Sequence, residues 1–275
     1  MNLYDLRQRA KAWLRHAPGI YQWRHQAYVR RFHDNRRSNL FHGVFDSFQA
    51  AGESAPDNRP SGYDNAPSAR LYLGDAFFRP HSYDYPAALW MARSFQEGLR
   101  SVADLGGSVG IKFYAFQKLM DLPQDVRWTV IDVPAVAQCG REVAGARSAG
   151  QRLDFSSSLE VLDDVDVLLA SGALQYLPQG LGEILAGLRR KPRRLIINTT
   201  PLHESLSFFT LNSIGTAYCP YRIGSRPEFM AQLETQGYAL RDEWRNDGKR
   251  MRLPFNPGYD VDGYSGMCLD FVAGS

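Results

Sequence analysis

Residues 102–110 read V-A-D-L-G-G-S-V-G. The apolar start predicts a short strand, and the glycines predict a tight turn into an amphipathic helix over residues 111–120. Glycine carries no Cβ, so the backbone of such a turn can approach a nucleotide-like ligand closely. The stretch therefore predicts a ligand-binding loop between a strand and a helix.

The spacing of small residues in this loop is compatible with three interpretations. Asp104, Gly106, Ser108 and Gly110 fit the acidic-x-G-x-G-x-G loop of S-adenosylmethionine (SAM) methyltransferases, with serine at the middle glycine position. Residues 106–110 also match the G-x-S-x-G elbow of α/β-hydrolases. A third interpretation is an ordinary strand-to-helix turn in which glycine only permits close packing. The surrounding sequence has to decide between them.

A second acidic residue, Asp132, follows the glycine loop at the spacing expected for a ribose-binding acid. Residues 126–131 form a β-branched, apolar run typical of a buried parallel strand, and Asp132 ends it. In doubly wound sheets, an acid about 20 residues past the glycine loop accepts hydrogen bonds from ribose hydroxyls. Asp132 also precedes Val133 and Pro134, so helix capping is an alternative role.

Further apolar runs predict the rest of a sheet. Strands are expected at residues 151–155, 166–170, 194–198, 238–244 and 266–273, with helices at 133–146, 180–190 and 227–236. Strands that alternate with helices predict an α/β fold with a mostly parallel, doubly wound, Rossmann-like sheet. Loops after the strand ends then carry the site, which adds Val133, Asp154, Phe155, Ser156, Ser171 and Gly172 to the cofactor contacts.

The order of several motifs resembles one family. Five strings in this order resemble those of SAM-dependent methyltransferases from bacterial surface-polysaccharide and secondary-metabolite gene clusters. They are D-L-G-G-S-V-G, W-T-V-I-D-V-P, L-D-F-S-S-S-L, L-L-A-S-G-A-L-Q-Y-L and T-T-P-L. Upstream, F-H-G-V-F-D-S-F, S-G-Y-D-N and Y-D-Y-P are also similar, so the match runs from about residue 40 onward. Two positions depart from the family: Asp132 stands for glutamate, and Asn212 for glutamine.

The resemblance implies a class I methyltransferase fold. It implies that SAM, which leaves as S-adenosylhomocysteine (SAH), is held by Asp104, Gly106, Gly107, Ser108, Gly110, Asp132 and the turn at residues 155–156. No metal is expected. Because Asp132 keeps a carboxylate, its change conserves the chemistry, whereas Asn212 bears on recognition of the acceptor.

Methyl transfer to a hydroxyl needs a base as well as alignment. His203 follows the fifth strand and histidine titrates near neutral pH, so it is the first candidate, with Glu204, Tyr176 and Tyr218 as alternates. The expected reaction is O-methylation of a small-molecule or sugar-type acceptor in glycan or natural-product biosynthesis. Acceptor contacts are expected from Tyr83, Tyr85, Gln175, Asn212, Tyr218 and Arg222.

Other functions stay open in a defined order. An NAD(P)-dependent oxidoreductase could use the same loop and Asp132, but Ser108 and the absence of a second half-fold argue against it. A protein that binds SAM or a partner without catalysis is another alternative. A serine hydrolase ranks last, because the only histidine after Ser108 is His203, well before the chain end.

The N-terminal part has a different composition. We predict two parts: a basic helical segment with an aromatic lid over residues 1–95, and a SAM-binding domain over residues 96–275. Arginines and aromatic residues interleave in the first forty residues, which is compatible with docking on the chain's own domain, with an anionic membrane surface or with a dimer partner. No nucleic-acid partner is expected.

Composition bounds the compartment and the class of protein. The 275 residues are 44% hydrophobic with a net charge of +3, which is typical of a globular enzyme. No run approaches the ~20 apolar residues of a membrane-spanning helix, and the start lacks the core of a signal peptide. Three widely spaced cysteines suggest reduced thiols. The expected location is the cytoplasm, with peripheral contact at the inner membrane surface as an option.

Overall fold

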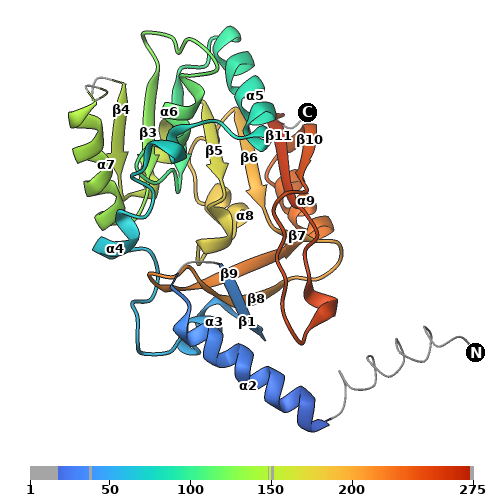
Figure 1. Ribbon diagram of the computed structural model, residues 1–275. Coiled ribbons are helices and arrows are strands. Elements are labelled where there is room, and N and C mark those ends of the chain that lie inside the picture. The colour runs from blue at the N-terminus through green and yellow to red at the C-terminus, as the bar shows by residue number, and fades with distance from the viewer. Residues whose placement is uncertain (1–17, 37–38, 148, 150–151, 273–275) are drawn as a thin grey trace, which may run out of the picture.

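The computed structural model describes residues 18–36, 39–147, 149 and 152–272. Its largest element is a sheet of seven strands in the order β10-β11-β6-β5-β2-β3-β4 (Figure 1). The strands are β2 (Ser101–Leu105), β3 (Arg127–Ile131), β4 (Leu153–Ser156), β5 (Val167–Ser171), β6 (Arg194–Thr200), β10 (Tyr238–Asn246) and β11 (Tyr264–Phe271). Each lies within a few residues of a strand that the sequence predicts.

The connections in this sheet define its class. Strands β2, β3 and β4 run parallel toward one edge, and β5 and β6 run parallel toward the other. The chain therefore reverses its order between β2 and β5, which is the point where doubly wound sheets bind ligands. Strand β11 is antiparallel to both β6 and β10. This order with one reversed strand is that of the Rossmann-like class I methyltransferase fold, as predicted.

Helices cover both faces of the sheet because its strands are apolar on both sides. One face packs against α5 (Tyr85–Gln96), α6 (Ile111–Phe116) and α7 (Pro134–Ala146). The other packs against the 3-10 helix η3 (Leu159–Asp164), α8 (Leu181–Ala186) and α9 (Arg226–Thr235). Helix α8 is shorter than predicted, since Gly187 ends it and Asp163 then binds the backbone of Arg189 at 2.6 Å.

A second sheet lies beyond the carboxyl ends of β5 and β6 (Figure 1). We call it the cap sheet; it contains β1 (Leu40–Phe45), β8 (Phe208–Ser213), β9 (Tyr218–Ser225) and β7 (Leu202–His203), in the order β1-β8-β9-β7. These strands are not predicted from the sequence. The cover over the ligand edge is therefore built from residues 40–45 together with an insertion between β6 and α9, whereas the prediction assigned it to the N-terminal part alone.

Short helices lie in the connections between the longer elements. They are α3 (Phe48–Glu53), α4 (Ala66–Ala69), η1 (Asp75–Phe78), η2 (Ser82–Asp84), η4 (Leu174–Tyr176) and η5 (Pro257–Tyr259). Helix α5 belongs to the core of the large sheet, because Trp90, Met91 and Phe95 are buried against it. The N-terminal part is thus shared between the two sheets, and the domain boundary at residue 95 stays a prediction.

Helix α2 (Pro18–Asp34) packs on the cap sheet. The Tyr28 hydroxyl donates a hydrogen bond to the carbonyl of Phe41 at 2.7 Å. Arg59 lies with its guanidinium 4.0 Å from the ring centre of Tyr218 and donates to the carbonyls of Phe32 and His33. Much of the predicted basic segment, residues 1–17 and 37, lies outside the described residues. No helix in the described part of the chain has the length and hydrophobicity to cross a bilayer.

Candidate functional site

The glycine loop lies at the point where the chain order reverses. Gly106 has φ +67°, and a Cβ there would lie 2.3 Å from Cβ of Ala173, which follows β5. A Cβ on Gly107 would lie 2.4 Å from Cγ of Asp104. Gly110 has φ +87° and precedes α6. These positions need glycine, because a side chain would either strain the backbone or collide with the neighbouring loop.

Asp104, at the end of β2, is completely buried. Its Oδ2 accepts a hydrogen bond from Trp128 Nε1 at 3.3 Å, and its Oδ1 has no partner among the described atoms. Burial raises the pKa of Asp104 to about 7. A buried acceptor without a donor is costly and occurs mainly where function requires it. The carboxyl group therefore suits a ligand that brings hydrogen-bond donors.

Asp132, at the end of β3, holds the glycine loop in place. Its Oδ2 accepts from the backbone N–H of Ser108 at 2.9 Å, and its Oδ1 accepts from the N–H of Val133 at 2.8 Å. Burial raises the pKa of Asp132 to about 6. Asp132 thus fixes both the loop and the start of α7, and it leaves lone pairs on a carboxylate that lies beside the loop.

The predicted contacts Asp154, Phe155 and Ser156 lie within β4 and are placed less favourably than those of the glycine loop. Phe155 is buried against α7, where a Cβ on Gly140 would lie 2.2 Å from its ring. Asp154 is exposed and its Oδ1 accepts from the N–H of Phe155. Ser156 Oγ accepts from the N–H of Ser158. Phe155 is therefore a core residue in the first place, and Asp154 and Ser156 stabilise the local turn.

The residues after β5 connect to a buried polar network. Ser171 Oγ lies 3.3 Å from Nδ2 of Asn198 in β6, and Asn198 Nδ2 also donates to Asp84 Oδ1 at 3.2 Å. Trp244 Nε1 donates to Asn198 Oδ1 at 2.9 Å. Asp84 forms an ion pair of 2.6 Å with Lys112. No local pattern predicts Asp84, Lys112 or Asn198 as site residues, although Lys112 lies two residues after the glycine loop.

Five tyrosines gather between this network and the cap sheet. Tyr176 is in ring contact with Tyr63 and with Tyr221, at 5.0 Å between centroids in each case. Tyr221 and Tyr264 share a hydrogen bond of 2.7 Å between their hydroxyls. The fifth member is Tyr72, which lies near Tyr63. Burial, together with Tyr176 and Tyr72, raises the pKa of Tyr63. Aromatic walls of this kind suit a cationic or ring-shaped ligand.

The first predicted general base, His203, is engaged by the backbone in this structure. His203 Nδ1 accepts from the backbone N–H groups of Ser205 and Leu206, so the ring hydrogen lies on Nε2 and is directed to the carbonyl of Gly258, 3.2 Å away. A base needs a free lone pair directed at its substrate, and both His203 nitrogens are occupied by the backbone. Glu204 lies in the exposed turn beside it.

Tyrosine does not replace histidine as the base. Burial raises the pKa of Tyr176 well above its ordinary value near 10, so a phenolate is disfavoured at neutral pH. Tyr218 is fully buried in the cap sheet, where its hydroxyl donates to the carbonyl of His33. The structure therefore places Tyr176 among the five tyrosines and Tyr218 in the scaffold of the cap sheet.

The predicted acceptor contacts fall into three groups. Tyr83 is half-buried with Lys112 Nζ 5.5 Å from its ring centre, so it borders the polar network. Asn212 is buried and binds both the Tyr176 hydroxyl and the carbonyl of Leu40, which makes it a structural link. Tyr85 belongs with Asn212 in the second group, which lies outside the network and the cavity, because Tyr85 is 57% exposed on the outside of α5. Gln175 and Arg222 form the third group, since both line a cavity.

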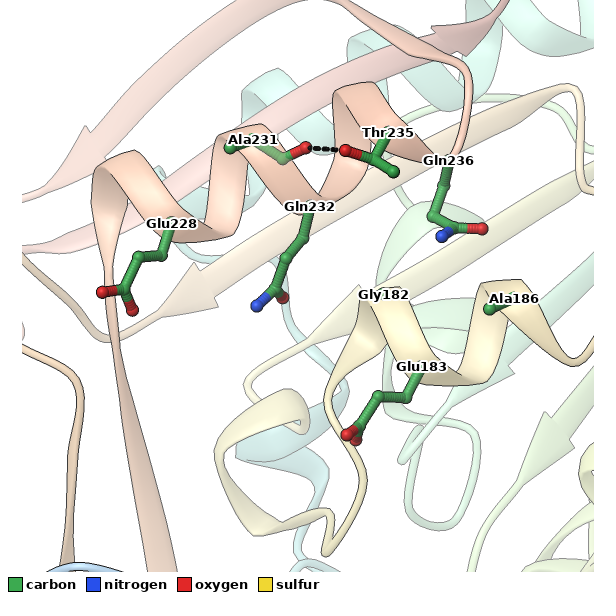
Figure 2. A pocket seen from close by; sticks show the side chains of 8 residues that line it. All are labelled: Gly182, Glu183, Ala186, Glu228, Ala231, Gln232, Thr235 and Gln236. Carbon is green, nitrogen blue, oxygen red and sulfur yellow. Dashed lines mark hydrogen bonds between the residues drawn. The ribbon is translucent and has the colours of Figure 1, made fainter.

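This cavity of about 280 Å³ lies under the cap sheet at the end of β6, where Thr200 and Phe208 also line it. A wider groove of about 500 Å³ runs between α8 and α9 (Figure 2). Its two acids are engaged in structural contacts, Glu183 with the N–H of Gly180 and Glu228 with the hydroxyl of Ser207. The groove is lined by residues of α8 and α9, away from the glycine loop, and neither acid is free to act on a ligand. The cavity, in contrast, borders the carboxyl end of β6.

No group of three His, Cys, Asp or Glu side chains in the described part of the chain is placed to hold a metal ion. No family model matches the sequence, and no curated protein matches it.

Several solved structures have a similar fold. The CcbJ methyltransferase from Streptomyces caelestis matches 79% of this chain over 100% of its own, with 17% identity and a TM-score of 0.48. A Burkholderia thailandensis 1,6-didemethyltoxoflavin-N1-methyltransferase, solved with that compound and SAH, matches 80% of this chain over 95% of its own. The identity is 20% and the TM-score is 0.43. The mitomycin 7-O-methyltransferase MmcR matches 95% of this chain over 71% of its own, with 15% identity and a TM-score of 0.45. These likenesses are too distant to carry a function, which depends on this chain's own residues.

Proposed function

We propose that this protein is a SAM-dependent methyltransferase that acts on a small-molecule or sugar-type acceptor, with O-methylation as the reaction. One observation carries the proposal: Asp132, at the end of the second parallel strand, holds the glycine loop through the N–H of Ser108 while its carboxylate lies at the edge where ligands bind. An acid and a glycine loop joined in this way form a site for the ribose of an adenosine ligand.

The residues present fit SAM in charge and in shape. Asp132 would accept hydrogen bonds from the ribose hydroxyls, and the loop from Gly106 to Gly110 would admit the ligand, since side chains there would block it. Asp104 offers a buried oxygen without a donor, which suits the ammonium group of SAM. Ser171 and Gly172 flank the loop from β5. Bound SAM supplies a methyl group that is activated by its sulfonium.

The cap sheet and the tyrosines would serve the acceptor. They cover the ends of β5 and β6, exclude water and align the acceptor oxygen with the donor. Gln175, Arg222 and Tyr83 remain our candidates for acceptor contacts, because the first two line the cavity and the third borders the polar network. We place the acceptor among natural-product or surface-glycan intermediates, and the enzyme in the cytoplasm.

The basic N-terminal segment keeps the three roles predicted for it: docking on the chain's own domain, contact with an anionic membrane surface, or contact with a second copy. The packing of α2 on β1 supports the first for residues 18–34. The rival activities gain no support. A serine hydrolase would need a histidine beside Ser108, and no described residue forms a hydrogen bond with its hydroxyl. An oxidoreductase would use the same loop, so the choice of cofactor has to be measured.

Calorimetric titration with SAM, SAH and NAD tests the proposal. We expect micromolar binding of SAM and SAH by the native protein and weaker binding by Asp132→Ala, by about 1 to 3 kcal/mol if the ribose hydrogen bonds form. Asp121→Ala is the matched control, because Asp121 is an exposed aspartate away from the loop. Absence of SAM binding, or tight NAD binding instead, would refute the proposal.

A further inference from the structure

Lys249 lies at the same edge of the sheet as the glycine loop. It follows β10, which pairs antiparallel with β11, and β11 pairs antiparallel with β6. Strand β10 is therefore parallel to β6, and both end at the edge where the ligand site lies. The Lys249 side chain is half-buried, with Nζ 4.9 Å from the ring centre of Tyr264.

Among residues 18–36, 39–147, 149 and 152–272, the Lys249 ammonium has no anionic partner. No described acid forms an ion pair or a hydrogen bond with it, although the neighbouring Lys112 is neutralised by Asp84 at 2.6 Å. Burial and the charge of Lys112 lower the pKa of Lys249 to about 8. It is therefore still mostly protonated at pH 7. An unpaired charge that is partly withdrawn from water is costly, and a ligand of opposite charge removes that cost.

The surroundings of Lys249 connect it to the chemistry of the site. Lys112 lies in the first turn of α6, the helix after the glycine loop. Its partner Asp84 accepts a hydrogen bond from Asn198, which also contacts Ser171 at the end of β5. On the other side, Tyr264 is hydrogen-bonded to Tyr221 of the cap sheet. Lys249 thus lies between the network of the large sheet and the aromatic wall of the cap.

We propose that Lys249 binds an oxyanion, a carboxylate or phosphate group, of a ligand held at this edge. Its assignment to methyl transfer rests on the proposed function. Two sources could supply the oxyanion: the acceptor, which would then be an acidic or phosphorylated molecule, or the carboxylate of SAM itself. Tyr264 places the ammonium by cation–π contact, and Asp84 keeps Lys112 from adding a second free charge.

The first experiment uses sulfate as the probe, because its charge does not change near neutral pH. Thermal unfolding is measured in sodium sulfate and in sodium chloride of equal ionic strength for the native protein, Lys249→Met and Lys249→Arg. Lys118→Met is the matched control, since Lys118 is exposed. We expect the sulfate-specific rise in Tm in the native, Lys249→Arg and Lys118→Met proteins, and its loss in Lys249→Met, which corresponds to at least tenfold weaker binding.

The pH dependence separates Lys249 from other cations. The groups that face its ammonium are Lys112 and Tyr264. Burial raises the pKa of the Tyr264 phenol to about 12, so Tyr264 stays neutral in the pH range of the test. Sulfate binding by the native protein should fall as the pH rises through about 8, and binding by Lys249→Arg should persist. A profile that stays flat in the native protein would overturn the role of Lys249.

The second experiment identifies the source of the oxyanion. SAM and decarboxylated SAM are titrated into the native protein and Lys249→Met. If Lys249→Met weakens SAM about tenfold but leaves decarboxylated SAM unchanged, the oxyanion is the SAM carboxylate. If SAM binding is unchanged while sulfate binding is lost, the oxyanion belongs to the acceptor. If neither SAM binding nor sulfate binding depends on Lys249, the inference is wrong. Sulfate binding that depends on Lys249 in a protein that does not bind SAM would leave the subsite standing and refute the proposed function.

Discussion

Lys112 Nζ lies 2.6 Å from Asp84 Oδ1, and this ion pair joins the helix after the glycine loop to the turn that starts α5. Asp84 is completely buried and Lys112 is 9% exposed. The backbone N–H of His81 and Nδ2 of Asn198 also donate to the Asp84 carboxylate. The pair therefore fixes the glycine loop relative to the strand ends.

Removal of Lys112 should be more harmful than removal of the whole pair. In Lys112→Met the Asp84 carboxylate is left buried without its cation, and we expect a loss of about 3 to 5 kcal/mol in the free energy of unfolding. The double variant Asp84→Asn/Lys112→Met carries no buried charge and should recover much of that loss. Urea unfolding of the three proteins measures both effects. Equal losses in the single and double variants would show that the charge is not the cause.

Asp104 should make the folded protein less stable as the pH rises. An unfolded aspartate titrates near pH ~3.9, whereas burial raises the pKa of Asp104 to about 7. Between these values the folded state binds more protons than the unfolded state, so this group's contribution to the free energy of unfolding falls with rising pH. Asp104→Asn should therefore be more stable than the native protein at pH 8, on the order of 1 to 4 kcal/mol.

The difference between the two proteins should shrink as the pH falls below 7, and urea unfolding at pH 5, 6.5 and 8 checks this. A constant difference would contradict the assignment. The same variant should lose SAM affinity, because the unpaired Oδ1 of Asp104 is an acceptor in the proposed site. A gain in stability together with a loss of binding is typical of a functional carboxylate.

Gly106→Ala and Gly145→Ala should act in opposite directions. At Gly106 the positive φ and the close approach of Ala173 oppose a Cβ, and we expect a loss of at least about 1 to 2 kcal/mol together with weaker SAM binding. Gly145 lies in α7 with open space around it. Alanine there should stabilise the helix by up to about 1 kcal/mol. Thermal unfolding and SAM titration of both variants provide the test, and equal behaviour would refute it.

The large sheet was predictable because parallel strands buried on both faces are continuous apolar runs. Residues 166–170 and 194–198 are of this kind, and both are strands in the structure. The cap sheet was not predictable in the same way. Strands β8 and β9 mix aromatic and polar residues, and β9 contains Pro220. The strand β1 pairs with β8, far along the chain, and a local pattern does not report such a partner.

In the candidate site too, residues fixed by the local sequence were predictable, whereas residues placed by tertiary packing were not. Asp104 and Asp132 were predictable, because an acid at the end of a strand has a position fixed by the local sequence. Lys112 and Lys249 were not, since their burial and their partners come from tertiary packing. The backbone contacts of His203 were not predictable either, because only the structure shows that the turn after β7 directs two N–H groups to its ring.

The pairing of β1 with β8 also affects how the chain folds and opens. Residues 40–45 have to meet residues 208–213 before the cap sheet is complete, which requires closing a very long loop, whereas the pairs β2–β3 and β5–β6 close much shorter ones. The cap sheet should therefore be completed late and exchange its amide hydrogens sooner than the centre of the large sheet. Entry to the ligand edge then needs only a partial, reversible unfolding of the cap, with the glycine loop left intact.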